Sequence, residues 1–321
     1  MAKVGQRCGK KMKMQINAIK IWKIALFFVP LQAKRVIAAM IGVFDSGYGG
    51  LTILKEIREQ LPEYDYIYLG DNARAPYGTR SFECIYHYTL EAVNYLQQQG
   101  CTLIILACNT ASAKALRTIQ QHDIDPEKVR VLGVIRPTVE VVPQLTRSGH
   151  VGVLATPGTV ASESYLIELE KQDSLQRSQG ALQYKQLVVS QLACPMWVPL
   201  IEAGEHESEG ARYFIRKYVR EIIGRDPQID TLLLGCTHYP LIQSAIDAEL
   251  AAAGHSTCKT IAQGEIVAQS LKDYLRRHPE IEQRLQKGGE CTYLTTDDSD
   301  KFADSATLFL GSPVGAKHVE Y

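Results

Sequence analysis

Two pairs of similar segments recur within this chain. The segment IGVFDSGYGG (41–50) is similar to VGVLATPGTV (151–160), and ILACNTASA (105–113) is similar to LLGCTHYPL (233–241). In the second pair, an apolar run ends in a small residue and continues into a cysteine with polar neighbours. Such self-similarity predicts two related halves, each with a cysteine at the end of a strand.

The hydrophobic pattern of the first half alternates short apolar runs with longer amphipathic segments. It predicts strands over 41–44 and 102–106, and helices over 50–61, 81–100 and 110–121. Strands that alternate with helices are typical of mostly parallel sheets. We therefore expect an α/β fold with two pseudo-symmetric α/β lobes and an active site in the cleft between them.

The two lobes are expected to interleave along the chain. Residues 41–138 and 239–321 should form the first lobe, and residues 139–238 the second. Open α/β sheets bind ligands at the carboxyl ends of their strands. If the lobes face each other, Cys108 and Cys236 line one cleft from opposite sides, although one cysteine at a strand end can also be a small buried residue.

Residues 1–40 differ from the rest of the chain in charge. They contain nine Lys or Arg and no Asp or Glu, with an apolar run, IALFFVPL, at 24–31. We interpret them as a weakly ordered basic extension before a natural start at Met40. The alternatives are a signal peptide, for which LQA is a poor cleavage site, and a surface helix on anionic lipid. No run of about 18 apolar residues occurs, so no membrane span is expected.

Charge and cysteine usage exclude several classes of function. Because nine of the 35 basic residues lie in the extension, the remainder carries 26 Lys or Arg against 35 Asp or Glu, which argues against nucleic acid as a primary partner. The eight cysteines form no C-x-x-C pair, so we expect no metal site and a reduced, cytoplasmic protein. GYGG (47–50) lacks the spacing of a dinucleotide motif, and no cofactor is expected.

Two thiols that face each other indicate a particular chemistry. A cysteine at a strand-to-helix turn lies near free helix N–H groups, which should lower the pKa of the thiol. A hydrolase needs one cysteine and a histidine, with no second cysteine in the mirror position. Stereochemical inversion suits two thiols: one thiolate removes a proton from a carbon, and the other thiol returns one to the opposite face.

Six segments carry a resemblance to a known family. They are IGVFDSGYGGLT (41–52), GDNARAPYG (70–78), ACNTASA (107–113), VGVLATPGTVAS (151–162), ACPMWVPLIEAG (193–204) and LGCTHYPL (234–241). Together they resemble bacterial glutamate racemases, in the cofactor-independent aspartate/glutamate racemase superfamily, over residues 41–310. The resemblance implies a two-base interconversion of L-glutamate and D-glutamate, which supplies D-glutamate for peptidoglycan.

The resemblance also implies roles for individual catalytic residues. Cys108 is expected to take the α-proton from the D-enantiomer and Cys236 from the L-enantiomer. Asp45 is expected beside Cys108, and His238 beside Cys236 with Glu202 nearby. The sequence leaves open whether His238 or Glu202 is the main helper, and whether Asp45 tunes the thiol or faces the substrate ammonium.

Substrate-binding residues are implied in the same way. Hydroxyls, amides and backbone N–H groups at turns can hold carboxylates, and donors at the α-carboxylate would stabilise a carbanion-like transition state. The residues that match the family are Asp45, Ser46, Tyr77, Gly78, Asn109, Thr110, Thr237 and His238, with Thr159 as a further candidate.

Three other functions remain open from the sequence. One is a related racemase or isomerase that acts on aspartate, hydantoins or maleate. Another is a hydrolase that uses Cys236 and His238, although their i, i+2 spacing makes that pairing awkward. The third is an amino-acid-binding regulator without catalysis. We expect a small-molecule substrate and a homodimer.

Overall fold

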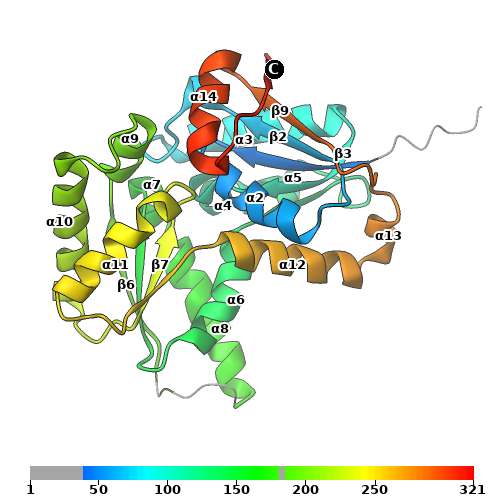
Figure 1. Cartoon of the computed structure of the whole chain (residues 1–321). Helices are drawn as coiled ribbons and strands as arrows, with labels where there is room; N and C mark the ends of the chain where they lie inside the picture. Colours follow the sequence, from blue (N-terminus) through cyan, green and yellow to red (C-terminus); the bar gives the residue numbers. More distant parts are fainter. Residues whose placement is uncertain (1–38, 181–183, 185) are drawn as a thin grey trace, which may run out of the picture. The chain divides into compact units, whose positions relative to one another are not determined.

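The strands of this protein form two parallel sheets, as seen in a computed structural model that describes residues 39–180, 184 and 186–321 (Figure 1). The strands are β1 (Met40–Asp45), β2 (Tyr66–Gly70), β3 (Cys101–Leu106), β4 (Arg130–Gly133), β5 (His150–Ala155), β6 (Val188–Ala193), β7 (Thr231–Gly235), β8 (Lys259–Ile261), β9 (Cys291–Thr295) and β10 (Ala316–His318). Of the basic extension expected over residues 1–40, all but the last two residues lie outside the described residues.

The two sheets repeat one topology. The six-stranded sheet has the order β10-β9-β2-β1-β3-β4, and the four-stranded sheet has the order β6-β5-β7-β8. All pairings are parallel. The order β2-β1-β3-β4 therefore corresponds strand for strand to β6-β5-β7-β8, and the larger sheet adds β9 and β10. This confirms the α/β fold with two related halves that the internal repeat predicts.

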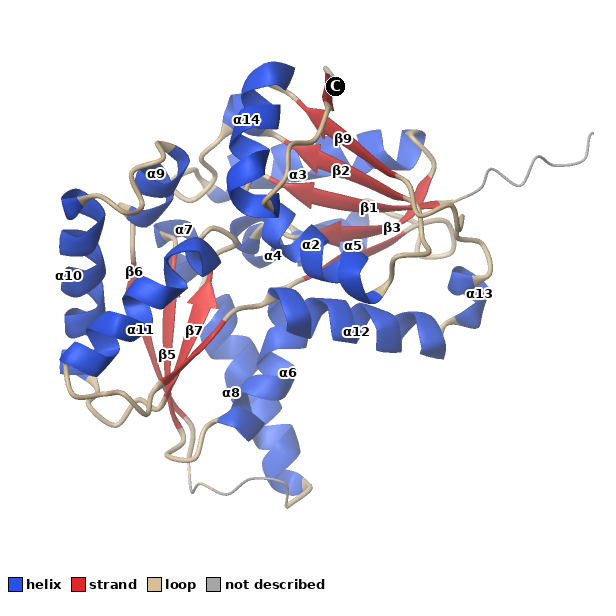
Figure 2. Cartoon of the chain, in the orientation of Figure 1, coloured by secondary structure: helices blue, strands red, loops and turns tan. Residues whose placement is uncertain are grey.

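Helices cover both faces of the larger sheet (Figure 2). Alternate residues of β3 enter different apolar clusters: Ile105 packs with Leu54 of α2, whereas Ile104 packs with Val93 of α3. The α-helices are α2 (Leu51–Gln60), α3 (Phe82–Gln98), α4 (Asn109–Lys114), α5 (Leu116–His122), α6 (Ile135–Leu145), α7 (Pro157–Ala161), α8 (Ser164–Ser178), α9 (Trp197–Glu202), α10 (Glu209–Arg225), α11 (Gln243–Ala252), α12 (Gly264–Arg277), α13 (Pro279–Glu282) and α14 (Ser299–Leu310), with 3₁₀ turns η1 (Asn72–Arg74) and η2 (Tyr239–Ile242). Within the described ranges, no helix combines the length and apolarity that crossing a membrane requires.

Most predicted elements are confirmed, and one helix differs. The segment expected as a single helix over 110–121 is two helices, α4 and α5, which meet at Ala115. Ser112 donates to the Leu106 carbonyl of β3 at 2.8 Å, whereas Gln120 donates to the Val131 carbonyl of β4 at 2.7 Å. The first helix is thus hydrogen-bonded to β3 and the second to β4, which accounts for the break between them.

The chain crosses between the sheets at other points than expected. Ile135 and Val139 of α6 already pack with Val151 of the four-stranded sheet, so the first crossing precedes residue 139. The expected return at 239 is too early, because β8 pairs with β7. The chain returns to the larger sheet only after Ile261, through α12. Pairing along the sheet edge is a long-range interaction that the local pattern does not reveal.

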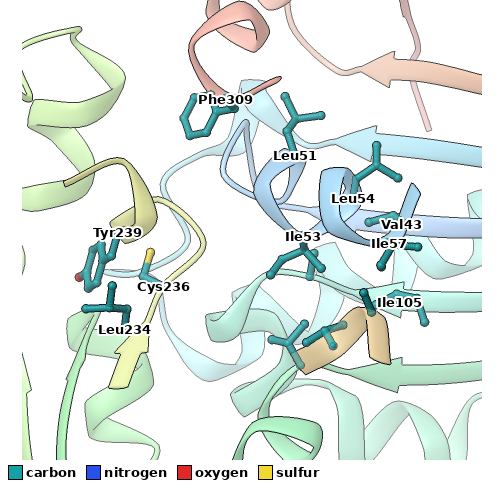
Figure 3. Packing of buried hydrophobic residues seen from close by; sticks show 14 of the residues in the cluster. Val43, Leu51, Ile53, Leu54, Ile57, Ile105, Leu234, Cys236, Tyr239 and Phe309 are labelled. Carbon is teal, nitrogen blue, oxygen red and sulfur yellow. The ribbon is translucent and has the colours of Figure 1, made fainter. Parts of the chain in front are cut away.

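One apolar cluster contains residues of both sheets. Val43 and Ile105 belong to it together with Leu234, Cys236 and Tyr239. Figure 3 shows Cys236 beside Leu234 and Tyr239, at the point where β7 ends and the η2 turn begins. The second cysteine is therefore anchored in packed core rather than on a loose loop.

Candidate active site

A small cavity of about 70 Å³ lies at the carboxyl ends of strands from both sheets. This is several times the ~15 Å³ that one water molecule needs. Ten of the residues expected at the site line it: Ser46, Tyr77, Gly78, Cys108, Asn109, Thr110, Glu202, Cys236, Thr237 and His238. The two cysteines that the sequence repeat relates thus line the same small cavity.

Cys108 follows β3 and is the N-cap of α4. Its thiol donates to the Ser46 hydroxyl at 3.5 Å. Burial and the nearby Asp45 carboxylate raise the pKa of the Cys108 thiol to about 12, although Ser46 and the backbone N–H of Ala111 act in the opposite direction. The expectation of a lowered pKa is wrong for this thiol, because desolvation outweighs the helix N-terminus.

Asp45 ends β1 and is fully buried beside this thiol, outside the cavity lining. Its Oδ2 accepts hydrogen bonds from the backbone N–H groups of Gly50 at 2.9 Å and Gly47 at 3.3 Å. Its Oδ1 has no hydrogen-bond partner among the described residues. Burial raises the pKa of Asp45, and the positive charge of His238 lowers it in part. Asp45 therefore has one oxygen available as a proton acceptor.

The second thiol begins a series of three contacting side chains, Cys236, His238 and Glu202. The Nδ1 of His238 lies 3.8 Å from the Cys236 sulfur, and its Nε2 lies 2.9 Å from Oε1 of Glu202. The His238 side chain is 4% exposed and that of Glu202 is 25% exposed. The imidazole of His238 therefore contacts the sulfur of Cys236, and the carboxylate of Glu202 contacts the imidazole. The two residues do not compete for one position.

His238 is held as a cation in this environment. Burial lowers the pKa of the imidazole, but the hydrogen bonds and charges of Cys236 and Glu202 outweigh burial and raise it to about 10. A cationic imidazolium beside the sulfur stabilises negative charge on Cys236. The corresponding position beside Cys108 holds a carboxylate, so the two thiols lie in opposite fields.

The turn after β1 packs tightly against the turn after β7. A Cβ atom added at Gly49 would lie 2.3 Å from Oγ1 of Thr237 and 2.4 Å from Nδ1 of His238. Thr52 adds a hydrogen bond from its hydroxyl to the Thr237 carbonyl at 2.9 Å. Only glycine permits this approach, which brings residues of the two sheets into contact beside Cys236.

Tyr77 and Gly78 line the cavity through a loop whose conformation is fixed from behind. The Tyr77 hydroxyl donates to the buried carboxylate of Asp71, which also pairs with Arg74 at 2.7 Å. The hydroxyl is thus already engaged, and the ring and backbone of Tyr77 remain for a ligand. The Gly78 carbonyl accepts from the Gly158 N–H at 2.7 Å, which joins the loop to α7.

Three threonine hydroxyls meet beside this loop, where Thr156 lies close to Gly78. Thr110 Oγ1 lies 3.0 Å from Thr156 Oγ1 and 3.3 Å from Thr159 Oγ1. Thr159 is fully buried and does not line the cavity, whereas Thr156 does. The residue of this segment that a ligand can reach is therefore Thr156, which the sequence analysis missed. Its signal is a threonine directly before Pro157, a pattern typical of a helix N-cap.

Comparison with known proteins identifies relatives of this chain. The family model for Asp/Glu/Hydantoin racemase matches residues 41–271. A glutamate racemase of Dinoroseobacter shibae is 39% identical over 290 residues, which cover 87% of this chain and 98% of that protein.

The chain is also similar to solved structures of glutamate racemases. Glutamate racemase isoform RacE1 from Bacillus anthracis has a TM-score of 0.76 at 32% identity, with 88% of this chain and 97% of that chain covered. Glutamate racemase from Francisella tularensis, solved in complex with D-glutamate, has a TM-score of 0.74 at 30% identity, covering 88% and 98%. Because the family model spans more than half of this chain and the relatives match over nearly their whole length, the chain belongs to the Asp/Glu/hydantoin racemase family.

Proposed function

We propose that this protein is a glutamate racemase that interconverts L-glutamate and D-glutamate by a two-base mechanism. The observation that carries the proposal is that Cys108 and Cys236, from equivalent strand ends of two related sheets, line one small cavity. The glutamate racemases to which the chain is similar support glutamate as the substrate.

In the L-to-D direction, Cys236 acts as the base. The imidazolium of His238 lies beside the Cys236 sulfur, where it can stabilise negative charge, whereas burial raises the pKa of Cys108 and keeps that thiol protonated at neutral pH. The Cys236 thiolate takes the α-proton, and the electron pair of the broken C–H bond remains on Cα and its carboxylate. The thiol of Cys108 then delivers its proton to the opposite face, which leaves a thiolate at Cys108.

In the D-to-L direction, the roles of the thiols are reversed. Cys108 must first lose its proton, and the unpartnered Oδ1 of Asp45 is the acceptor that we assign to this step. The raised pKa of Asp45 makes its carboxylate a stronger base than an ordinary aspartate, which brings it closer to the basicity of the thiolate. Asp45 is therefore assigned to the thiol rather than to the substrate ammonium, consistent with its position outside the cavity lining.

The polar residues of the cavity are proposed to hold the two carboxylates of the substrate. Hydroxyl and amide donors are contributed by Ser46, Asn109, Thr110, Thr156 and Thr237. Fixed donors beside the α-carboxylate stabilise the charge that develops when the α-proton leaves, without reorganisation of water. Backbone groups of the loop at Tyr77 and Gly78 complete the set of proposed contacts.

The test is exchange of the α-hydrogen of glutamate in heavy water, followed by proton NMR and circular dichroism. The purified protein should incorporate deuterium at Cα and abolish the optical activity of either enantiomer, without an added cofactor. A panel with aspartate and hydantoins separates glutamate from the other substrates of the superfamily. Tight binding of glutamate without exchange would indicate a regulator, and an acyl-enzyme at Cys236 would indicate a hydrolase; either result would overturn the proposal.

We further propose that the protein works in the cytoplasm and supplies D-glutamate for peptidoglycan. Seven cysteines among the described residues are free thiols, as a reducing compartment would maintain. Fractionation of the source cells and depletion of the protein, followed by analysis of the wall precursors, would test both parts. The expected homodimer is a further proposal, which sedimentation of the purified protein would test.

A further inference from the structure

A buried glutamine lies where the chain returns from the smaller to the larger sheet. Gln263 immediately precedes α12 and is 2% exposed. Its side chain makes no hydrogen bond that caps its own helix. The next residue, Gly264, is so close to α2 that an added Cβ would lie 2.6 Å from the Glu56 side chain. The backbone beside Gln263 is therefore held firmly against the larger sheet's helices.

The amide of Gln263 joins three other polar side chains. Its Nε2 donates to the Tyr165 hydroxyl at 2.8 Å and to the Thr138 hydroxyl at 2.9 Å. Its Oε1 accepts from Nδ2 of Asn109 at 2.7 Å, and Tyr165 donates to Oδ1 of Asn109 at 2.6 Å. Asn109, Gln263 and Tyr165 thus form a closed ring in which each donates to the next.

The direction of this ring is determined by a fourth residue. The Thr138 hydroxyl donates its only proton to the Val134 carbonyl at 2.8 Å, so it can only accept from Gln263. The nitrogen of Gln263 must then face Thr138, and its oxygen must face the nitrogen of Asn109. The remaining oxygen of Asn109 accepts from Tyr165. Each amide therefore has one orientation, and a ring of this kind is strengthened by mutual polarisation.

The ring connects the catalytic turn with both crossings between the sheets. Asn109 follows Cys108 and lines the cavity, whereas Tyr165 belongs to α8 of the smaller sheet. Thr138 lies on the first crossing segment, α6, and Gln263 begins the second. A change in the angle between the sheets would have to move Asn109 or break the ring.

We propose that Gln263 is a positioning residue for racemisation. It holds the side chain of Asn109 in the cavity at a fixed position relative to the junction of the two sheets. The inference rests on the proposed function, in which Asn109 holds a carboxylate of the substrate. Gln263 itself does not line the cavity and acts only through Asn109.

The test compares two buried glutamines. Gln263→Met keeps the length of the side chain but removes its hydrogen bonds. Gln176→Met is the matched control, because Gln176 is 4% exposed and its amide donates to the Glu140 carbonyl at 2.8 Å, which joins α8 to α6 far along the chain from Asn109. Both variants should lose thermal stability, since each removes a buried amide from its partners.

Of the two variants, only Gln263→Met should change the kinetics of glutamate racemisation. We expect KM to rise about tenfold, the change that the loss of one ordinary hydrogen bond to substrate produces, with kcat falling less. Gln263→Glu should recover part of the activity at low pH, where a protonated carboxyl can still donate, and lose it as pH rises. That dependence on pH would be absent from Gln176→Glu.

The outcomes separate this inference from the proposed function. If the wild-type protein does not exchange the α-hydrogen of glutamate, the proposed function fails. If the wild type is active and Gln263→Met has an unchanged KM, the positioning role is wrong. A crystal structure of Gln263→Met provides a test that does not depend on measured activity. The Asn109 amide should leave its position, and an unmoved amide would overturn the inference.

Discussion

The two halves of the active site share a topology but differ in charge. Cys108 follows β3 and Cys236 follows β7, and these strands occupy the same place in their sheets. A buried carboxylate, Asp45, lies beside the first thiol, and a cationic imidazole, His238, lies beside the second. Symmetry of the backbone thus positions the two sulfurs, whereas in the proposed mechanism the asymmetry of their neighbours selects the sulfur that begins as the base.

The largest loss of activity is expected when either sulfur is removed. Cys108→Ala and Cys236→Ala should each reduce racemisation by roughly 10³–10⁴-fold, because each direction of the reaction needs both an acid and a base. Circular dichroism of glutamate measures the rate. Cys101→Ala is the matched control, since Cys101 is also buried, at the other end of the strand that precedes Cys108, and its loss should cost stability without comparable loss of activity. Full activity in either active-site variant would exclude the two-base mechanism.

Substitution of Asp45 or His238, the residues proposed to assist the two thiols, should reduce activity less than loss of a sulfur. The two variants should also respond differently to pH. We expect Asp45→Asn and His238→Asn each to lower activity by about 10²-fold. Because the pKa of His238 is raised to about 10, its cation persists at neutral pH, and wild-type activity should decline as pH rises through that value. His238→Asn should lack this decline, whereas Asp45→Asn should retain it.

A half-buried histidine away from the cavity provides the control for this experiment. His150 lies 2.7 Å from Asp226, at the opposite end of the smaller sheet from the cavity. His150→Asn should leave the pH profile of activity unchanged. If it removed the decline at high pH, or if His238→Asn kept it, the assignment of the imidazolium to Cys236 would be wrong.

The contact between the two turns offers a test of intermediate size. Gly49→Ala forces a methyl group against Thr237 and His238, and we expect a loss of about 1–3 kcal/mol in the free energy of unfolding. Activity should fall as well, because the displaced groups include the helper of Cys236. Denaturant unfolding measures both free energies. Gly224→Ala, in α10 with open space around it, should be neutral or stabilising in that measurement. Equal effects of the two substitutions would show that the close approach is unimportant.

The smallest effect is expected from Glu202, which acts on the second thiol only through His238. Glu202 contributes to the raised pKa of the imidazole, so Glu202→Gln should move the decline in activity to lower pH. At neutral pH we expect only a few-fold loss, since the side chain is partly exposed and its charge is screened by solvent. A pH profile of racemisation measures the shift. An unchanged profile would leave His238 dependent on Cys236 alone.

The sequence was most informative where function follows from local pattern. The repeat of a small residue and a cysteine after an apolar run identified Cys108 and Cys236, and the strands before them are confirmed. Thr159 was the expected residue, but Thr156 lines the cavity, because two threonines three residues apart at the start of α7 look alike until that helix is placed against α4. Gln263 had no signal, since one glutamine before a helix is ordinary in sequence.

The fold class, the family and the pair of thiols could be predicted without the structure, since strand periodicity and short motifs are encoded by neighbouring residues. The packed structure was needed to show that Glu202 and His238 lie in series, that burial raises the pKa of Cys108, and that both crossings between the sheets meet at Gln263. These properties depend on desolvation and on contacts between residues far apart in the chain. Free energies of this kind arise from the packed environment of a group, and no local stretch of sequence contains that environment.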